Sequence, residues 1–422
     1  MLDIKFIREN LPLVKEGARK KRMTVDFERL FEVDDKRRAL LVSIEEKRAL
    51  QNRFSERIRE ETNASAKADR FAEMRGIKDI LEREERELRD IMREWQMLMV
   101  QVPNIPDMSV PEGDDERGNR QERTSGEKPQ FSFEPKSHVD LMQALDMVDF
   151  ERGAKVAGFR GYFLKNDGAA LSFAVWQFVY DHFRESGVTP MIVPSLLNRA
   201  PFLGTGYLPQ SEEDLYQTQD GQYLSGTAEV GTMGYFLDEI LDVKQLPIRS
   251  FSFSPCFRRE AGSHGKDTKG LIRVHEFYKF EQIVLCEASH EESVRWHETL
   301  TENSEKLMQA LGLPYRVVTN CGGDLGLGQV KKYDIEVWVP SEEKYRETHS
   351  SSYFHDFQTR RLNIRYRDGE GKIRFAHSLN NTALATPRIL VALIENNQEA
   401  DGSVKIPEAL VKFFGKNVIR SS

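Results

Sequence analysis

The sequence contains only three cysteines in 422 residues, and Cys256, Cys286 and Cys321 lie far apart along the chain. Their spacing matches neither a zinc site nor a framework of disulfide bonds, and it suits a reducing compartment. No apolar run reaches the length that spans a membrane, and the charged start Met1–Lys5 lacks the apolar core of a signal peptide. These absences predict a cytoplasmic protein that does not associate with membranes.

The sequence also lacks the two glycine-rich fingerprints of nucleotide binding, the dinucleotide motif and the P-loop. Their absence disfavours a doubly wound nucleotide-binding fold. The net charge is −7, so the chain has no overall excess of positive charge that would bind phosphates indiscriminately. An RNA partner would therefore need a local basic surface. The densest basic run, Arg19–Arg22, is better interpreted as the solvated face of a helix.

Two heptad patterns near the N-terminus predict a pair of long helices. Residues 74–102 repeat apolar side chains with heptad spacing, interrupted only by Glu84, and residues 30–58 carry a weaker repeat. The small, polar segment 62–68 between them is suited to a turn. Helices of about 30 residues give an arm of roughly 45 Å, since each residue adds about 1.5 Å. Such heptads also suit a coiled coil between two chains, but the turn favours an antiparallel hairpin within one chain.

Proline marks the end of the second predicted helix, because it cannot continue the helical hydrogen bonds. Residues 103–135 are rich in Pro, Gly, Asp and Glu and are predicted to form a linker. From about residue 136 the pattern changes to mixed helices and strands. The expected organisation is an arm over residues 1–102, a linker over 103–135 and a body over 136–422.

The stretch from Cys256 to Glu281 predicts two extended runs joined by a polar, glycine-rich loop. Side chains alternate along a strand, so Arg258 and Glu260 share one face of the first run. One face of the second run carries Arg273, His275, Phe277, Lys279 and Glu281. Arginine provides a planar fork for phosphate or carboxylate oxygens, an aromatic ring a flat face for a base, and a carboxylate an acceptor for an ammonium group. The pattern suits a nucleotide plus an amino acid; the alternative is an ordinary charged hairpin.

Three stretches resemble the motifs of the class II aminoacyl-tRNA synthetases. Residues 257–260, Phe-Arg-Arg-Glu, look like motif 2, and the whole string 256–281 is similar to that of the bacterial-type seryl-tRNA synthetases. Residues 191–194 look like the short strand and proline of motif 1, which implies a homodimer. Residues 377–388 resemble motif 3, although Asn381, Ala383 and Pro387 stand where the family favours glycines.

The resemblance implies an α+β fold, with an antiparallel helical hairpin that binds tRNA and a class II catalytic domain whose antiparallel sheet is flanked by helices. It implies a ligase that activates serine with ATP as seryl-adenylate and transfers the seryl group to the 3′ end of serine tRNA. Two alternatives are a paralogue that loads another acceptor, which would have lost the arm, and an inactive RNA-binding relative with broken motif arginines. Basic residues near the arm's tip are expected to contact the RNA backbone: Arg48, Arg53, Arg57, Arg59, Arg70 and Arg75.

The resemblance also assigns roles to individual residues. Arg258, at the α-phosphate and the serine carboxylate, and Arg388, at the γ-phosphate, are expected to be catalytic. The residues expected to bind serine are Thr227, Ala228, Glu229, Arg258, Glu281 and Thr382. The residues expected to bind ATP are Arg258, Arg259, Glu260, Val274, Phe277, Glu347, Thr348, His349, Ser350 and Arg388. Glu347 and Ser350 are also expected to hold Mg²⁺, which prefers hard oxygen ligands.

Two parts of this assignment have a second interpretation. The hydroxyl and carboxylate of Thr227-Ala-Glu229 suit serine and would disfavour alanine, whose missing hydroxyl leaves pocket groups unpaired. The same three residues equally predict the N-cap of a helix. His349 replaces a family serine and Tyr353 a family asparagine. A packed, hydrogen-bonded histidine is expected there rather than a metal ligand.

Overall fold

The computed structural model describes residues 1–184, 186–262, 265 and 267–421. Its contacts divide the chain into two compact units, Met23–Val102 and a body that joins Met1–Arg22 to Pro103–Ser422. This division differs from the sequence-based boundaries, because the first 22 residues belong with the body. None of the described helices combines the length and the apolar composition needed to cross a membrane.

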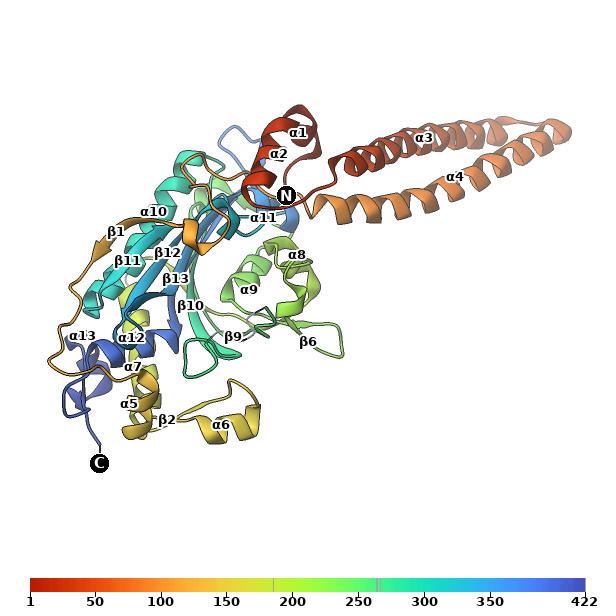
Figure 1. Cartoon of the computed structure of the whole chain (residues 1–422). Coiled ribbons are helices and arrows are strands. Elements are labelled where there is room, and N and C mark those ends of the chain that lie inside the picture. Colours follow the sequence, from red (N-terminus) through yellow and green to blue (C-terminus); the bar gives the residue numbers. More distant parts are fainter. Residues whose placement is uncertain (185, 263–264, 266, 422) are drawn as a thin grey trace. The chain divides into compact units, whose positions relative to one another are not determined.

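The unit Met23–Val102 is a pair of long helices, α3 (Phe27–Glu60) and α4 (Ala64–Met99), which run side by side in Figure 1. Each helix begins at a side-chain cap. The Asp26 carboxylate accepts a hydrogen bond from the Arg29 N–H, and Asn63 Oδ1 accepts from the N–H groups of Ser65 and Ala66. The connection is therefore shorter than the predicted turn, because the Asn63 cap starts α4 inside the segment predicted to be that turn.

Contacts between α3 and α4 confirm the predicted antiparallel hairpin. One polar residue of the first heptad, Lys47, meets the residue that interrupts the second, with Lys47 Nζ 2.9 Å from Glu84 Oε1. Arg29 and Arg48 of α3 also form ion pairs with Glu94 and Glu85 of α4. The buried apolar residues of the pair are Phe27, Leu30, Val33, Ile44, Ile58, Leu81 and Met99. The seam of each helix is thus completed by the other helix of the same chain.

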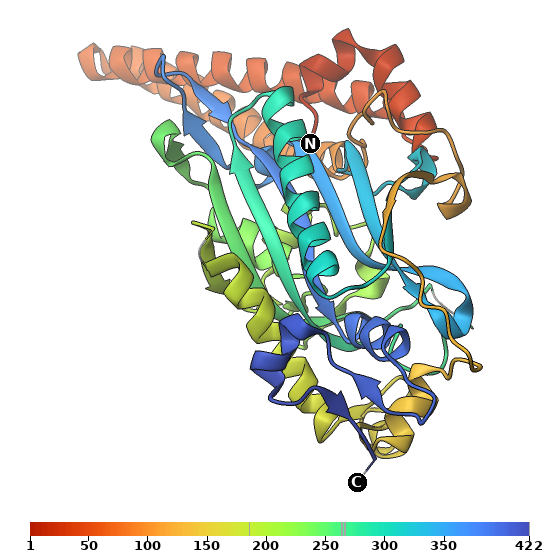
Figure 2. The same cartoon turned by 90° about the vertical axis from the view of Figure 1, so that its left-hand side faces the viewer.

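The body is built on a sheet of eight strands in the order β1-β11-β12-β13-β16-β10-β9-β4 (Figures 1 and 2). Every neighbouring pair is antiparallel except β4 and β9, which are parallel. The strands are β1 (Arg120–Ser125), β4 (Thr189–Ile192), β9 (Ile248–Phe257), β10 (Glu276–Cys286), β11 (Tyr315–Thr319), β12 (Lys331–Val339), β13 (Lys344–His355) and β16 (His377–Thr386). The predicted antiparallel sheet flanked by helices is confirmed.

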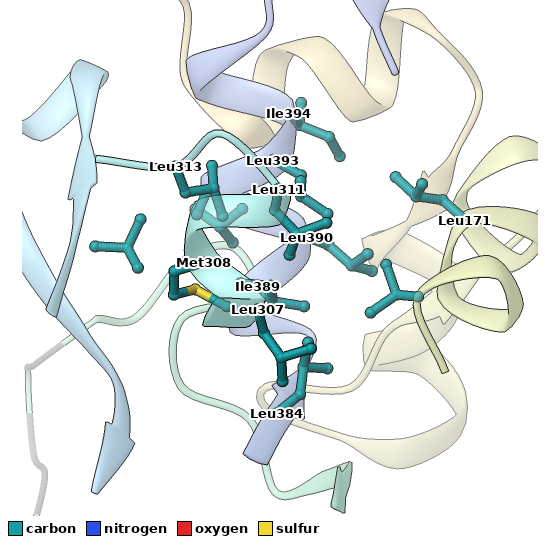
Figure 3. Close-up of a cluster of buried hydrophobic side chains, with 14 of the residues drawn as sticks. Leu171, Leu307, Met308, Leu311, Leu313, Leu384, Ile389, Leu390, Leu393 and Ile394 are labelled. Carbon is teal, nitrogen blue, oxygen red and sulfur yellow. The ribbon is translucent and has the colours of Figure 1, made fainter. Parts of the chain in front are cut away.

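Helices α7 (Asp167–Arg184), α10 (His290–Ala310), α12 (Arg388–Asn396) and α13 (Glu408–Phe414) flank this sheet. Figure 2 shows α10 lying across one face. The core packs apolar side chains of α10, of Leu311 directly after it and of α12 together (Figure 3), including Leu307, Ile389, Leu390 and Leu393. Each fully buried side chain of this kind contributes about 1.5–3 kcal/mol. Because Arg388 begins α12, this packing fixes the predicted motif 3 arginine.

Shorter elements complete the body. Its other α-helices are α1 (Ile4–Glu9), α2 (Leu11–Lys20), α5 (His138–Ala144), α6 (Phe150–Ala157), α8 (Arg199–Thr205), α9 (Ala228–Tyr235) and α11 (Phe357–Leu362). Its other strands are β2 (Val148–Asp149), β3 (Phe163–Leu164), β5 (Leu196–Leu197), β6 (Tyr216–Gln217), β7 (Tyr223–Leu224), β8 (Ile240–Asp242), β14 (Arg365–Arg367), β15 (Ile373–Phe375), β17 (Val404–Lys405) and β18 (Val418–Ile419).

The segment predicted to be a linker is in part ordered against the sheet. Strand β1 pairs with β11 at the sheet edge. The buried Asn104 donates from Nδ2 to the carbonyl oxygens of Gly328 and Phe354, at 3.1 and 2.8 Å. Its backbone N–H donates to the Leu327 carbonyl at 2.9 Å. The local composition alone indicated a linker. It could not reveal this anchoring, because contacts with residues more than 200 positions away leave no local pattern.

Replacing Asn104 with alanine is expected to lower the free energy of unfolding of the body by roughly 2–4 kcal/mol, because two buried carbonyls lose their donor. The exposed Gln130 provides a control, since its alanine variant is expected to stay within about 0.5 kcal/mol of the parent. Urea unfolding followed by tryptophan fluorescence measures both. Equal midpoints for the two variants would contradict the anchoring role of Asn104.

Candidate active site

The hairpin predicted from residues 256–281 is formed by β9 and β10. The two strands pair from Ile248–Leu285 to Phe257–Glu276, and the Arg258 N–H then donates to the His275 carbonyl at 2.9 Å. The second predicted run begins too early, because the strand starts at Glu276 and Arg273 precedes it. Hairpin pairing thus places Arg258 just beyond the end of β9.

A cavity lies between this hairpin, β13, β16 and the start of α12. It gathers most of the residues expected to bind ATP, together with two of those expected to bind serine, Arg258 and Thr382. Those that line it are Arg258, Glu260, Val274, Phe277, Glu347, Thr348, Ser350, Thr382 and Arg388. Those that do not line it are Thr227, Ala228, Glu229, Arg259, Glu281 and His349. Residues from three separated parts of the sequence therefore meet at one site.

Arg258 is held by contacts on two sides. Its Nη2 donates to the Gly226 carbonyl at 3.3 Å, and its guanidinium carbon lies 5.3 Å from the centre of the Phe277 ring. A side chain at position 226 would crowd it, since a Cβ there would lie 3.1 Å from Arg258 Cγ. Glycine at 226 therefore allows the loop before α9 to approach the arginine.

Arg388 and Glu347 contact each other in the lining of the cavity. Arg388 Nε donates to the Ile272 carbonyl at 2.9 Å, and Nη1 donates to the Glu347 carbonyl at 2.8 Å. The Glu347 carboxylate is 3.5 Å from the same guanidinium and is 46% exposed. Partial desolvation raises the pKa of Glu347, but the positive charges, Arg388 foremost, outweigh it and hold the pKa below its usual value. Glu347 is thus a charged carboxylate facing the cavity.

Glu260 is engaged by a network at the other wall. Its Oε2 is 2.5 Å from Arg273 Nη1. Asp267 contacts Arg273 at 3.6 Å and Arg346 at 2.6 Å, so it joins the hairpin loop to β13. Sequence reasoning placed Arg273 on the ligand face but gave it no role. The structure makes it the partner of Glu260.

Thr227 and Glu281 form a buried pair beside the cavity. Thr227 Oγ1 donates to Glu281 Oε1 at 2.7 Å and accepts from the Glu229 N–H at 3.2 Å. Thr227 is therefore both the N-cap of α9 and a partner of the predicted serine-binding glutamate. Lys279 Nζ forms an ion pair with Glu281 Oε1, while Glu281 Oε2 is buried without a protein partner. Glu281 Oε2 can therefore accept a hydrogen bond from an ammonium group or a hydroxyl of a ligand.

The other residues outside the cavity have contacts of their own. Ala228 is buried in the first turn of α9, and Arg259 Nη1 donates to the Glu213 carbonyl at 3.1 Å in a separate surface hollow. His349 is buried between the Thr348 hydroxyl, at 2.8 Å, and the Ala383 carbonyl, at 3.0 Å. Burial lowers the pKa of His349 to about 4, so the ring is neutral. His349 is thus packed and hydrogen-bonded, as expected from the sequence.

The donor set of the cavity fits a magnesium ion. Within the described ranges, no cluster of three or more His, Cys, Asp or Glu side chains forms a metal site made of protein ligands alone. Glu347 and Ser350 both line the cavity and offer a carboxylate and a hydroxyl oxygen. Mg²⁺ typically takes one or two such protein oxygens and completes its shell with phosphate and water.

Lys279 was not assigned to the serine site from the sequence, although it is the buried partner of Glu281. The strand pattern could have indicated this role, since residues two apart on a strand share a face. Tyr207, which follows α8, and Gln358 of α11 contact Glu229 from distant parts of the sequence, so no local pattern indicated them.

Burial raises the pKa of Glu229 to about 7. The nearby charge of Glu281 also raises this pKa, whereas the hydrogen bond from Gln358 lowers it. The folded protein therefore binds a proton at Glu229 more tightly than the unfolded chain does. The associated stability is present below the unfolded pKa of 4.5 and is lost as pH rises through about 7. We expect Glu229→Gln to remove roughly 3 kcal/mol of the decline in unfolding free energy between pH 4.5 and 8. Urea unfolding at several pH values measures this, and identical profiles would contradict it.

The fold and the site together define a class of protein. The antiparallel sheet contains the β9–β10 hairpin with Arg258 and Glu260 at its end, and the strand β13 with Glu347. Helix α12, which begins at Arg388, completes the lining of the cavity. This is the architecture of a class II aminoacyl-tRNA synthetase body. Residues 213–397 match the family model of the tRNA synthetase class II core domain (G, H, P, S and T).

The second match narrows the class. Residues 1–106 match the seryl-tRNA synthetase N-terminal domain. The serine–tRNA ligases of Deinococcus radiodurans and Thermodesulfovibrio yellowstonii are 46% and 44% identical, the first over 98% of both chains and the second over 100% of both. The solved seryl-tRNA synthetase of Pyrococcus horikoshii complexed with ATP has a TM-score of 0.90 at 39% identity, and both chains are covered completely. The chain belongs to the seryl-tRNA synthetase family.

Proposed function

We propose that the chain activates serine with ATP and then transfers the seryl group to the 3′ end of serine tRNA. The observation that carries the proposal is one cavity that joins Arg258, Glu347 and Arg388, with the Thr227–Glu281 pair beside it. Relatives of the full length are serine–tRNA ligases, and two solved seryl-type relatives hold ATP or AMP. These support ATP as the substrate.

The first step forms seryl-adenylate. A serine carboxylate oxygen bonds to the α-phosphorus, the bond to the bridging oxygen breaks, and pyrophosphate leaves. Arg258 would contact the α-phosphate and the serine carboxylate, and Arg388 would contact the γ-phosphate. Such chemistry depends on position and on fixed positive charge rather than on a protein base.

The remaining cavity residues would hold the nucleotide. The ring of Phe277 and the backbone around Val274 would pack against adenine, with Glu260 beside them and Thr348 and His349 in the strand behind. Arg259 would have to leave its contact with the Glu213 carbonyl to reach ATP. Glu347 and Ser350 would hold Mg²⁺, which neutralises phosphate charge when it is bound.

Serine would occupy the space beside the cavity. Its ammonium group would approach Glu281, whose Oε2 has no protein partner. Its hydroxyl would find the Thr227–Glu229 segment and Thr382. A pocket of this kind rejects alanine, because polar groups that expect a hydroxyl would stay unpaired.

Two further partners, serine tRNA and a second copy of the chain, would bind outside the cavity. The helical arm would hold the long variable arm of serine tRNA, with one subunit of a homodimer binding it while the other acylates its end. Strand β4 at the sheet edge supports the dimer, since Ile192 is 87% exposed and the neighbouring α7 exposes Phe173 to 65%. Large exposed apolar side chains at a sheet edge suit pairing with a second copy. The protein would act in the cytoplasm.

The proposal is tested by aminoacylation. The purified chain is incubated with total bacterial tRNA, ATP, Mg²⁺ and labelled serine, and the base-labile label on tRNA is counted. We expect serine to be attached to serine tRNA alone. Seryl-adenylate without any charged tRNA would instead indicate a paralogue with another acceptor, and no activity at all would indicate an inactive relative.

A further inference from the structure

Near the Thr227–Glu281 pair, four polar side chains form a hydrogen-bonded chain, and only Glu229 among them was expected to bind a substrate. They are Tyr207 after α8, Glu229 of α9, Gln358 of α11 and Ser378 of β16. Glu229 and Gln358 are 3% and 1% exposed, and Ser378 is fully buried. Buried polar groups are costly unless paired, so a chain of this kind fixes one arrangement of its members.

The direction of each hydrogen bond follows from its donor. Ser378 Oγ donates to Gln358 Oε1 at 2.7 Å, and Gln358 Nε2 donates to Glu229 Oε1 at 2.7 Å and to the Thr205 carbonyl at 3.3 Å. A flipped amide would set its oxygen against both the carboxylate and the carbonyl. Gln358 therefore presents N–H to Glu229 whenever the Glu229 carboxyl is ionised.

Tyr207 holds the other oxygen of the same carboxylate. Its hydroxyl donates to Glu229 Oε2 at 3.3 Å. Burial raises the pKa of this hydroxyl well above its usual value, and the charges of Glu229, Arg258 and Glu281 also act on it. The backbone N–H of Glu229 also bonds to Thr227, which bonds to Glu281.

We propose that Gln358 is a positioning residue for amino-acid selection. By holding the Glu229 carboxylate between its own amide and Tyr207, it orients that carboxylate toward the side-chain hydroxyl of the substrate. This inference rests on the proposed function, because it assumes that serine binds beside Thr227. Gln358 touches neither ATP nor the reacting atoms, so it sets the preference for serine over alanine and leaves nucleotide binding alone.

The test uses two stable mimics of the adenylate, seryl- and alanyl-sulfamoyl adenosine, whose Kd values are measured by calorimetry on the full chain. Gln358→Met keeps the side-chain volume but removes the donor. We expect the Kd of the seryl mimic to rise about 10- to 100-fold, as for the loss of a hydrogen bond to a charged group. The Kd of the alanyl mimic and that of ATP are expected to change less than about threefold, because neither ligand has the hydroxyl.

Gln398→Met is the matched control, since Gln398 is 3% exposed and makes similar bonds to Lys136 and Glu395. It is expected to bind both mimics as the parent does. Ser378→Ala removes the hydroxyl that donates to Gln358 Oε1, so the amide is held less firmly, and the variant is expected to act in the same direction by about 3- to 10-fold. This milder variant keeps the test decisive if Gln358→Met does not fold.

Two outcomes would overturn the inference, and they differ from failure of the proposed function. Equal loss of affinity for both mimics in Gln358→Met or Ser378→Ala would mean a merely structural role. Unchanged discrimination in folded variants would mean that Glu229 needs no positioning. A parent chain that does not prefer the seryl mimic would instead overturn the proposed substrate, and this inference with it.

Discussion

Replacing Arg258 with alanine is expected to slow serine-dependent exchange of pyrophosphate into ATP by about 10²–10³-fold, the usual effect of losing one fixed charge at the transition state. Arg258 is the guanidinium placed between Phe277 and the Gly226 loop, beside the Thr227–Glu281 pair. Its backbone pairing with His275 does not depend on the side chain, so the fold should survive. Exchange kinetics with saturating ATP and serine provide the measurement.

The matched control is Arg117→Ala. Arg117 is 85% exposed and pairs with Asp115 on the surface of the body. We expect it to retain the parental rate. An Arg258→Ala protein that folds and exchanges pyrophosphate as fast as this control would contradict the proposed role of the hairpin.

Replacing residues 35–95 with a short linker is expected to abolish charging of serine tRNA while serine activation continues. The cavity is lined entirely by residues of the body, which the deletion does not touch. Contacts between basic side chains and RNA phosphates add affinity and position the partner without entering the chemistry. Aminoacylation and pyrophosphate exchange are measured on the same preparation.

A full-length variant provides the finer comparison. Arg53, Arg57 and Arg59 are exposed on α3, and reversing all three to glutamate leaves the buried seam intact. We expect weaker charging whose dependence on salt is shallower than that of the parent, because fewer phosphates are neutralised, with unchanged pyrophosphate exchange. Normal charging by the deletion protein would show that the arm is only a structural hairpin.

The arm could be predicted in detail because its information is local. Heptad spacing predicted both helices. Two of the polar residues within the heptads, Lys47 and Glu84, form an ion pair across the hairpin. The hairpin of β9 and β10 was also predictable, because alternation along each strand and the glycine-rich loop lie in one continuous stretch. Only the start of β10 was misplaced, since nothing local distinguishes Arg273 from the strand that follows it.

Other features depend on contacts that leave no local pattern. Residues 1–22 join the body partly through Lys21, whose Nζ donates to the carbonyls of Leu327 and Gln329 at 2.9 and 2.6 Å. Asn104 anchors to the same loop. In the site, Tyr207 and Gln358 reach Glu229 from elsewhere in the sequence. Motif resemblance could suggest Glu229 but not the side chains that orient it.

Pyrophosphate exchange into ATP by the unmodified chain, with Mg²⁺ and serine but without tRNA, tests most directly whether this cavity activates serine. We expect exchange that depends on serine and is far slower with alanine or threonine at the same concentration. Absence of serine-dependent exchange from a folded protein that binds ATP, or equal exchange with alanine, would contradict the proposed function.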